Sequence, residues 1–333
     1  MKILEVSRYK NNFADHQLPF VTEQGGALRA AGCEVDYFLV KGSYIGAVRA
    51  LKAKIRECRP DIVHAHYGLS AITAELQGLV PVVTTFHNGE THSWWVNMMT
   101  SLFSLKAKHV IYVAPHIRDL VYFKAKNYSI IPCGVPMDQM IITPKDEARR
   151  QLGWDPDEKY ILFGGAFDNL RKNFALLRDA IERLKNDTSY IKYNTSNIEC
   201  VEMKNLTRSQ CVLRMCAADL FALPTKNEGS PQALKEAMAC NCPIVATDVA
   251  DIKYLLGDLP GHYVLPNKKC DGAWWKGDEH SAEELATLLK QALAFERRTE
   301  GRKRIEELGY TNELVAQKII KIYQHVLEEN KQR

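Results

Sequence analysis

The sequence predicts an α/β protein made of two consecutive doubly wound domains. Short β-like runs alternate with helix-like stretches from the first residues onward, a pattern typical of βαβ units around a parallel sheet. The alternation is interrupted once near the middle of the chain and then restarts. The length of 333 residues also exceeds the usual size of one hydrophobic core, so two domains of about 150 residues each are expected.

The first alternating series defines a domain over residues 1–142. Residues 19–31 are an expected helix closed by Gly32, and residues 44–58 are another that ends before Pro60, because glycine and proline terminate helices. The expected strands are residues 3–6, 35–40, 61–66, 81–86, 109–113 and 128–132.

The second series defines a domain over residues 143–310. It follows a segment that Gly134, Pro136 and Pro144 break into turns. Residues 311–329 carry apolar side chains at near-helical spacing, so they predict an amphipathic helix that packs on a domain surface. The other expected strands are residues 159–163, 198–202, 220–223 and 244–246, and the other expected helices are residues 174–184, 209–217 and 232–240.

The composition excludes several classes of protein. Hydrophobic residues make up 46% and charged residues 25% of the chain, which is typical of a globular protein. A net charge of +4 without a concentrated basic face argues against nucleic acid as a partner. Nine cysteines without a Cys-x-x-Cys pair predict reduced thiols in a cytoplasmic protein. Neither a signal-peptide core nor an apolar run of about 18 residues occurs, so any membrane contact is expected to be peripheral.

The run FALPTKNEGSPQALKEAMACNCPIVAT reads as strand, turn, helix and strand. Ser230 is the expected N-cap of the helix and Pro231 its first residue. Such a helix begins at the carboxyl end of a parallel strand, where open α/β sheets bind ligands. Its free N–H groups, from Gly229, Ser230, Gln232 and Ala233, and its partial positive charge suit a phosphate or diphosphate.

Two carboxylates bracket this anion site. Glu228 precedes the helix and Glu236 lies in its second turn. Carboxylates are strong acceptors for sugar hydroxyls, and a nucleotide sugar has hydroxyls on both sides of its diphosphate. The alternative is a solvated, capped helix, because two acidic residues at this spacing also occur by chance.

The longer run EGSPQALKEAMACNCPIVATDVADI resembles the glutamate-x7-glutamate segment of the large retaining glycosyltransferase family 4, the glycosyl transferases group 1. The resemblance extends to PFVTEQGGALRAAGCEVDYFLV and to IIPCGVPMD. It implies the GT-B fold, with two Rossmann-like domains facing across a cleft. It further implies that the acceptor binds the first domain and the nucleotide sugar the second, and that residues 311–333 cross back to the first domain.

The resemblance also assigns roles within this run. It implies that Glu228 contacts the donor sugar and that Glu236 holds the ribose. The backbone between them, including Gly229, Ser230, Pro231, Gln232 and Ala233, would bind the diphosphate.

A second element is GGAFDNLRKNFALL, where Gly165 follows an expected strand end. Lys172 matches the lysine of the family. Ala166 and Phe167 stand where relatives place an arginine, and Arg171 is the candidate substitute. Two cations here would neutralise a leaving diphosphate; the alternative is a pair of exposed basic residues at a turn.

Three histidines follow two neighbouring strands of the first domain. His64 and His66 lie at one strand end and His87 follows the next, so the three could approach one another. No carboxylate ligand is evident in the sequence, and we expect neither a metal ion nor another cofactor. The resemblance instead matches His87 to a histidine near the donor sugar, although Asn88, Gly89 and Glu90 depart from the usual residues.

The segment SWWVNMMTSLFSL covers much of a helix with large apolar side chains. These side chains are Trp94, Trp95, Met98, Met99, Leu102 and Phe103. Ordinary core packing of them is the favoured interpretation. The alternative is a patch that touches a lipid-linked acceptor or the membrane surface. A later loop carries Trp274 and Trp275, for which the sequence gives no specific account.

The resemblance implies a metal-independent, retaining hexosyltransferase of cell-surface polysaccharide synthesis. It would transfer a sugar from a UDP- or GDP-sugar to a hydroxyl of a glycan or lipid-linked acceptor, in the cytoplasm or peripherally on the inner face of the membrane. One alternative is a nucleotide-sugar epimerase of the same architecture, because the fold alone does not fix the reaction. The other is a non-catalytic nucleotide-sugar-binding protein. The absence of a GxGxxG fingerprint argues against a dehydrogenase.

Overall fold

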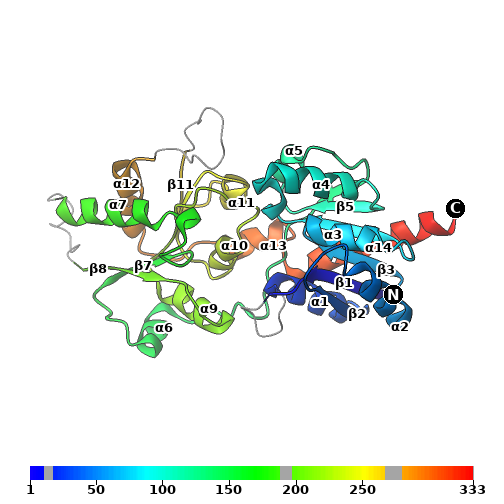
Figure 1. Ribbon diagram of the computed structural model, residues 1–333. Helices are drawn as coiled ribbons and strands as arrows, with labels where there is room; N and C mark the ends of the chain where they lie inside the picture. The colour runs from blue at the N-terminus through cyan, green and yellow to red at the C-terminus, as the bar shows by residue number, and fades with distance from the viewer. Residues whose placement is uncertain (11–17, 188–196, 267–279, 333) are drawn as a thin grey trace. The chain divides into compact units, whose positions relative to one another are not determined.

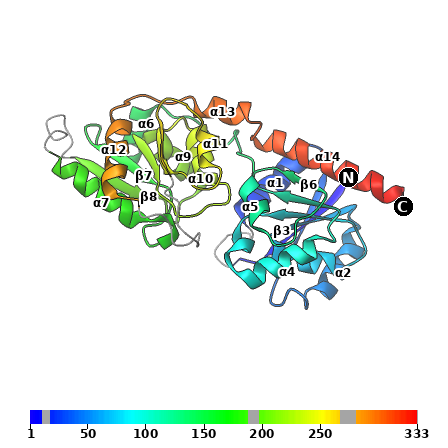
Figure 2. The ribbon, with the colours of Figure 1, turned by 90° about the horizontal axis from the view of Figure 1, so that it is seen from above.

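The computed structural model describes residues 1–10, 18–187, 197–266 and 280–332; Trp274 and Trp275 lie outside this part of the chain. The chain forms two compact units. Unit 1 comprises Met1–Gly134 with Gly309–Arg333, and unit 2 comprises Val135–Leu308. Each unit contains a parallel sheet with helices packed around it, as the alternating pattern predicts (Figure 1, Figure 2).

The sheet of unit 1 has the order β2-β1-β3-β4-β5-β6. The chain turns in opposite directions from β1, so the order reverses between β1 and β3, the kind of position where open sheets bind ligands. Its strands are β1 (Lys2–Arg8), β2 (Glu34–Val40), β3 (Ile62–His66), β4 (Val82–Phe86), β5 (His109–Tyr112) and β6 (Tyr128–Ile130). Its helices are α1 (Pro19–Ala30), α2 (Val48–Cys58), α3 (Gly68–Glu75), η1 (Gly89–His92), α4 (Trp94–Ser104), α5 (Pro115–Leu120) and α14 (Asn312–Lys331).

The C-terminal helix α14 completes unit 1. The Thr311 side chain caps it by accepting the N–H of Leu314 at 3.3 Å. Its apolar side chains, among them Ile319 and Tyr323, join a buried cluster with side chains of α1 and the strands. Figure 2 shows α14 running beside α1. The prediction that the last residues form an amphipathic helix packed on the first domain is therefore confirmed.

The sheet of unit 2 has the order β11-β10-β9-β7-β8, which reverses between β7 and β9. Its strands are β7 (Lys159–Phe163), β8 (Ile198–Glu202), β9 (Leu220–Leu223), β10 (Ile244–Thr247) and β11 (His262–Leu265). Its helices are α6 (Lys145–Leu152), η2 (Leu170–Lys172), α7 (Phe174–Asn186), α9 (Arg208–Ala217), α10 (Gln232–Ala239), α11 (Ile252–Leu256), α12 (Ala282–Leu293) and α13 (Gly301–Glu307).

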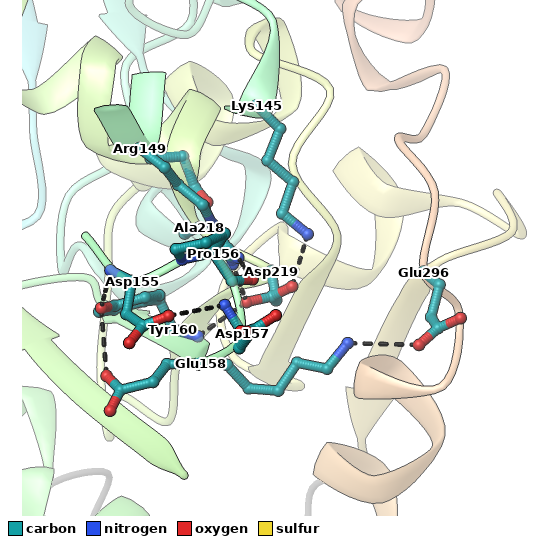
Figure 3. Close-up of polar contacts among 12 residues, drawn as sticks. Lys145, Arg149, Asp155, Pro156, Asp157, Glu158, Tyr160, Ala218, Asp219 and Glu296 are labelled. Carbon is teal, nitrogen blue, oxygen red and sulfur yellow. Dashed lines mark hydrogen bonds and ion pairs between the residues drawn. The ribbon is translucent and has the colours of Figure 1, made fainter. Parts of the chain in front are cut away.

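An ion-pair cluster fixes the amino-terminal edge of the unit 2 sheet (Figure 3). Asp219, just before β9, lies 2.6 Å from both the Arg149 guanidinium and the Lys145 ammonium. It also accepts the backbone N–H of Tyr160 at the start of β7, at 2.7 Å. The cluster therefore holds β7 and β9 together at the edge opposite to their carboxyl ends.

Helix α4 contradicts the prediction of core packing for its large side chains. Trp94 is 70% exposed, Trp95 51% and Leu102 46%. The buried residues of α4 are instead Asn97, Thr100, Ser101 and Ser104. The hydroxyls of the last three donate to carbonyls of the same helix, which removes the cost of burying them, and small side chains let α4 approach α3 closely.

No helix in the described part of the chain is long and apolar enough to span a membrane.

Candidate functional site

The reversal point of the unit 2 sheet brings Lys172 and Glu228 together. Lys172 ends the short helix η2 after β7, and Glu228 lies in the loop between β9 and α10. Their Nζ and Oε1 atoms are 2.7 Å apart and both side chains are largely buried. The Thr225 hydroxyl lies 3.1 Å from the same carboxylate oxygen. Sequence reasoning placed both charged residues in the site but did not predict that they pair.

The glycines after β7 make room for this ion pair. A Cβ atom on Gly165 would lie 2.9 Å from Cγ of Lys172, closer than side-chain atoms pack. A Cβ atom on Gly164 would lie 2.6 Å from the Phe221 ring. The glycine pair therefore lets the Lys172 stem lie against the backbone.

Arg171 is placed differently from Lys172. Its carbonyl accepts the N–H of Lys226 at 2.9 Å, which ties the loop after β7 to the loop after β9. Its N–H donates to Oδ1 of Asn169 at 3.2 Å. The residue as a whole is exposed, so the structure brings Lys172, and not the Arg171 guanidinium, to the buried carboxylate.

Helix α10 begins at Gln232, as the expected range 232–240 has it, but its cap differs from the expected one. Pro231 is its N-cap, with φ −68° and ψ 112°, and Gln232 is the first helical residue. The Ser230 hydroxyl does not cap the helix, because it donates to Oδ2 of Asp251 at 2.7 Å. Ser230 as N-cap and Pro231 as first helical residue are thus wrong by one position, while Gly229 and Ala233 still flank the helix start.

Glu236 lies on α10 and forms an ion pair with Arg208, the first residue of α9. Burial raises the pKa of Glu236, and the Arg208 charge opposes that rise. Two carboxylates, one ammonium group and a helix N-terminus thus lie along the carboxyl ends of β7 and β9. The ammonium and the helix N-terminus can hold an anionic group, and the carboxylates can accept hydroxyl protons.

Sequence reasoning missed three residues of this neighbourhood. Arg208 pairs with Glu236, Asp251 accepts from Ser230, and Lys235 is completely buried beside them on α10. Burial raises the pKa of Asp251, against the Ser230 hydrogen bond. Lys235 lies on the same helix as Glu236, and Asp251 lies near the end of the run that resembles the family, so both carried a signal in the sequence. Arg208 comes from a separate segment.

In unit 1, His87 follows β4 among aromatic rings. Its ring centroid is 4.6 Å from that of Phe20 and 4.8 Å from that of Tyr67. Tyr67 has φ 67° and Asn88 has φ 92°, conformations that cost energy in residues other than glycine and that cluster at functional sites. A Cβ atom on Gly89 would lie 3.2 Å from the Tyr67 ring.

The departures from the family pattern after His87 have a structural role. The Glu90 carboxylate is buried and accepts the N–H of Gly68 at 2.8 Å and that of His87 at about 3.2 Å. Burial raises the pKa of Glu90 to about 7 despite these hydrogen bonds. Glu90 therefore ties the loop after β4 to the start of α3.

The three histidines do come together, and a carboxylate joins them. Glu5 on β1, His64 and His66 place potential ligand atoms within 4.8 Å of one another, all completely buried. The sequence-based statement that no carboxylate ligand is evident is corrected by Glu5, which pairs with His64 across the parallel strands. The same atoms are engaged in hydrogen bonds: His66 Nε2 lies 2.6 Å from Glu5 Oε2, and His64 Nδ1 lies 2.6 Å from the Tyr323 hydroxyl.

Two family models match this chain. The model described as Glycosyltransferase Family 4 matches residues 20–139, and the model described as Glycosyl transferases group 1 matches residues 158–291.

Curated relatives are similar over part of their length. A Bacillus subtilis (strain 168) glycosyltransferase named for teichuronic acid biosynthesis, TuaC, is 25% identical over 224 residues, which are 61% of this chain and 57% of TuaC. The D-inositol 3-phosphate glycosyltransferase of Pseudarthrobacter chlorophenolicus is 23% identical over 254 residues, which are 63% of this chain and 60% of the relative. The chain thus spans less than two thirds of the length of either relative.

Solved structures are similar over nearly the whole chain. The sucrose-phosphate synthase of Thermosynechococcus elongatus has a TM-score of 0.77 at 20% identity, covering 98% of this chain and 99% of that chain. Anabaena HepE in complex with UDP-glucose has a TM-score of 0.71 at 14% identity, covering 98% and 100%. These similarities concern the fold.

Proposed function

Because this chain belongs to the group 1 glycosyltransferases of family 4 and has their GT-B fold, we propose that it is a retaining hexosyltransferase. It transfers a sugar from a UDP- or GDP-sugar to a hydroxyl of a glycan or lipid-linked acceptor in polysaccharide synthesis. The observation that carries the proposal is the buried Lys172–Glu228 ion pair, which lies just before the N-terminus of α10.

Donor binding follows from the charges at this point of the sheet. A diphosphate at the N-terminus of α10 gains the backbone N–H groups and the partial positive charge of the helix. Lys172 supplies a full positive charge. Its Nζ atom is held in place by Glu228 Oε1, at 2.7 Å. Glu236 accepts hydroxyl protons of the ribose, and Glu228 accepts those of the sugar. The structure of Anabaena HepE with UDP-glucose supports a donor of this class.

The reaction breaks the bond between the anomeric carbon and the diphosphate, so negative charge grows on the departing phosphate. Lys172, Arg171 and the α10 N-terminus stabilise that charge. The acceptor hydroxyl attacks from the same face of the sugar, and its proton passes to the leaving phosphate oxygen. His87 orients the sugar. These cationic groups do the work that a divalent metal ion performs in other transferases, so we propose that turnover needs no metal.

The exposed surface of α4 supports a lipid-linked acceptor and peripheral contact with the inner face of the membrane. Asn97 connects α4 to the segment after α5, because its side chain donates to the carbonyl of Leu120 and accepts the N–H of Tyr122. This connection brings the segment with exposed Tyr122 beside α4, which carries the exposed Trp94 and Trp95. We call this region the α4 patch; it comprises Trp94, Trp95, Leu102, Leu120, Tyr122 and Phe123, and exposed Lys124 and Lys126 follow it.

A ligand screen and one substitution test the proposed reaction. UDP or GDP should raise the melting temperature, because a ligand that binds only the folded state stabilises it. Incubation of a matching nucleotide sugar without acceptor should give slow hydrolysis; formation of an epimer would instead favour an epimerase, and neither binding nor hydrolysis would favour a non-catalytic protein.

Lys172→Ala should lower turnover by about a hundredfold or more, because the leaving charge loses its main counter-charge. Steady-state kinetics measure the fall. The matched control is Lys204→Ala, which removes an exposed ammonium that pairs with Asp168 in the same unit and should leave turnover near normal. Near-normal turnover of Lys172→Ala would remove Lys172 from the mechanism.

A further inference from the structure

One face of the unit 1 sheet changes from apolar to polar along three neighbouring strands. On the face covered by α1 and α14, apolar side chains near the strand starts join the buried cluster with α14. Further along the same face, the side chains are ionisable or polar and almost completely buried. The succession is Ile3 then Glu5 on β1, Ile62 then His64 and His66 on β3, and Val83 then Thr85 on β4, with His87 following. Buried polar groups are costly unless hydrogen-bonded.

Hydrogen bonds on this face connect Glu5 to His66 and His66 to His87. Burial would raise the pKa of Glu5, but the facing imidazoles of His64 and His66 outweigh burial and lower it, so its carboxylate is ionised. An ionised carboxylate only accepts, so His66 carries its proton on Nε2, 2.6 Å from Glu5 Oε2. His66 Nδ1 lies 3.2 Å from His87 Nε2. When His66 Nδ1 accepts this hydrogen bond, His87 carries its proton on Nε2.

We propose that Glu5 and His66 are positioning residues that hold His87 in its Nε2–H tautomer, so that His87 Nδ1 can accept a hydroxyl proton of the donor sugar. The inference rests on the proposed function, in which His87 orients the sugar. His87 Nδ1 lies 3.7 Å from the Cys133 thiol, which a sugar hydroxyl would replace as donor.

His64 keeps the hydrogen bonds among Glu5, His66 and His87 in one direction. Among the described contacts, His64 makes no hydrogen bond with the His87 ring. Burial lowers the pKa of His64 to about 3, so this ring is neutral. The Tyr323 hydroxyl lies 2.6 Å from its Nδ1 and the Thr85 hydroxyl 2.7 Å from its Nε2. Both nitrogens are thus engaged away from Glu5, and the carboxylate is left to accept from His66.

Nitrogen-15 NMR of the histidine-labelled full chain tests the tautomer directly. Long-range couplings distinguish Nε2–H from Nδ1–H, and the signals of His87 are identified by their loss in His87→Gln. The wild-type ring should be Nε2–H. In Glu5→Gln the amide can donate or accept, so His66 can reverse and His87 should populate both tautomers. An Nδ1–H ring in the wild-type protein would overturn the proposal without any variant.

Kinetics of the same variants separate a positioning role from a structural one. Glu5→Gln should lower kcat by about tenfold or more, as expected for a misplaced proton on a catalytic histidine, with the affinity for UDP or GDP unchanged. Ser129→Ala is the control: it removes a hydroxyl that lies 2.9 Å from Nε2 of another unit 1 histidine, His109, and should leave both the His87 tautomer and kcat as in the wild type.

Three results would contradict the proposal. The first is wild-type kcat in Glu5→Gln; the second is loss of the His87 tautomer preference in Ser129→Ala. The third is a tightly bound metal ion in the purified protein, found by elemental analysis and held by Glu5, because the metal would take the lone pairs that the hydrogen bonds require. If the wild-type protein binds neither UDP nor GDP, the proposed function fails, whereas the NMR measurement still decides the tautomer.

Discussion

At the scale of single residues, Glu236 offers the most direct test of nucleotide binding. Its buried carboxylate faces Arg208 and, in the proposed role, accepts hydroxyl protons of the ribose. Glu236→Ala should weaken the affinity for UDP or GDP roughly tenfold to a hundredfold, because a hydrogen bond to a charged group contributes about 1.5–3 kcal/mol. Isothermal titration calorimetry measures the change.

The matched control is Glu199→Ala, an exposed carboxylate on β8 of the same unit. It should leave the affinity unchanged. Equal affinities in Glu236→Ala and the wild type would remove Glu236 from the nucleotide site.

Glu75 is the residue through which pH should change the stability of unit 1. Burial raises the pKa of Glu75 to about 8, against the charges of Lys106 and Lys108. The unfolded chain releases this proton near pH 4.5 and the folded chain near pH 8, so the folded state loses stability as pH rises between these values. Glu75→Gln removes this loss and should be more stable than the wild type at pH 8.5 by up to about 5 kcal/mol, because one pKa unit corresponds to about 1.4 kcal/mol.

Thermal unfolding of both proteins at pH 5 and pH 8.5 measures this effect. His64 acts in the opposite direction, because its folded pKa of about 3 lies below its usual 6.5, but its contribution cancels in the comparison. A difference between the two proteins that does not grow with pH would show that Glu75 ionises normally.

Residue types allowed part of the site to be predicted. Glu228 and Lys172 are typical of a site that binds a diphosphate sugar, and the structure brings them into contact. Glu5 could not be predicted in the same way, because it belongs to no motif in the sequence that indicates a ligand site. It joins His66 only through the pairing of β1 with β3.

At the scale of elements, the Asp219 cluster should stabilise unit 2. Asp219 is 8% exposed and takes up the charges of Arg149 and Lys145 as well as a backbone N–H. Asp219→Asn should lower the free energy of unfolding by about 3–5 kcal/mol, because it leaves a buried guanidinium without its counter-charge. Urea unfolding measures the loss.

Asp187→Asn is the control, since its ion pair with Lys290 is about 40% exposed and should contribute about 1 kcal/mol or less. Nucleotide affinity should survive in both folded variants, because Asp219 lies at the opposite edge of the sheet from the carboxyl ends. Similar losses of stability in the two variants would contradict the prediction that the Asp219 cluster stabilises unit 2 more than the exposed ion pair does.

Helix α4 illustrates a limit of reading elements from periodicity. Large apolar side chains cover much of the helix in sequence, so either a buried or an exposed helix fitted the pattern. The structure buries the small polar side chains, because only these allow α4 to pack closely against Gly68 of α3. Which stripe faces inward is decided by the size of the space that the neighbouring helix leaves.

At the scale of the whole molecule, the α4 patch and the net charge of +4 predict binding to an anionic membrane surface. Exposed tryptophans insert at the interface of a bilayer, and lysines attract anionic lipids. The protein should cosediment with vesicles that contain phosphatidylglycerol, less so as salt rises, and Trp94→Ala with Trp95→Ala should reduce the bound fraction several-fold.

Tyr254→Ala is the control, because it removes an exposed aromatic ring from α11 in unit 2 and should bind vesicles like the wild type. Equal binding of the double tryptophan variant and the wild type would show that the α4 patch does not bind the membrane.

The sequence alone determined the succession of strands and helices, the two units and the last helix of unit 1. It could do so because alternating apolar runs and turn residues act over a few neighbouring positions. It also marked the loop before α10, since glycine, proline and two glutamates lie close together in the chain. Tertiary structure decided the partners: Lys172 with Glu228, Glu236 with Arg208, and Glu5 with His66. Each pair joins segments that are far apart in the chain, and these meet only once the parallel strands have paired in the folded sheet.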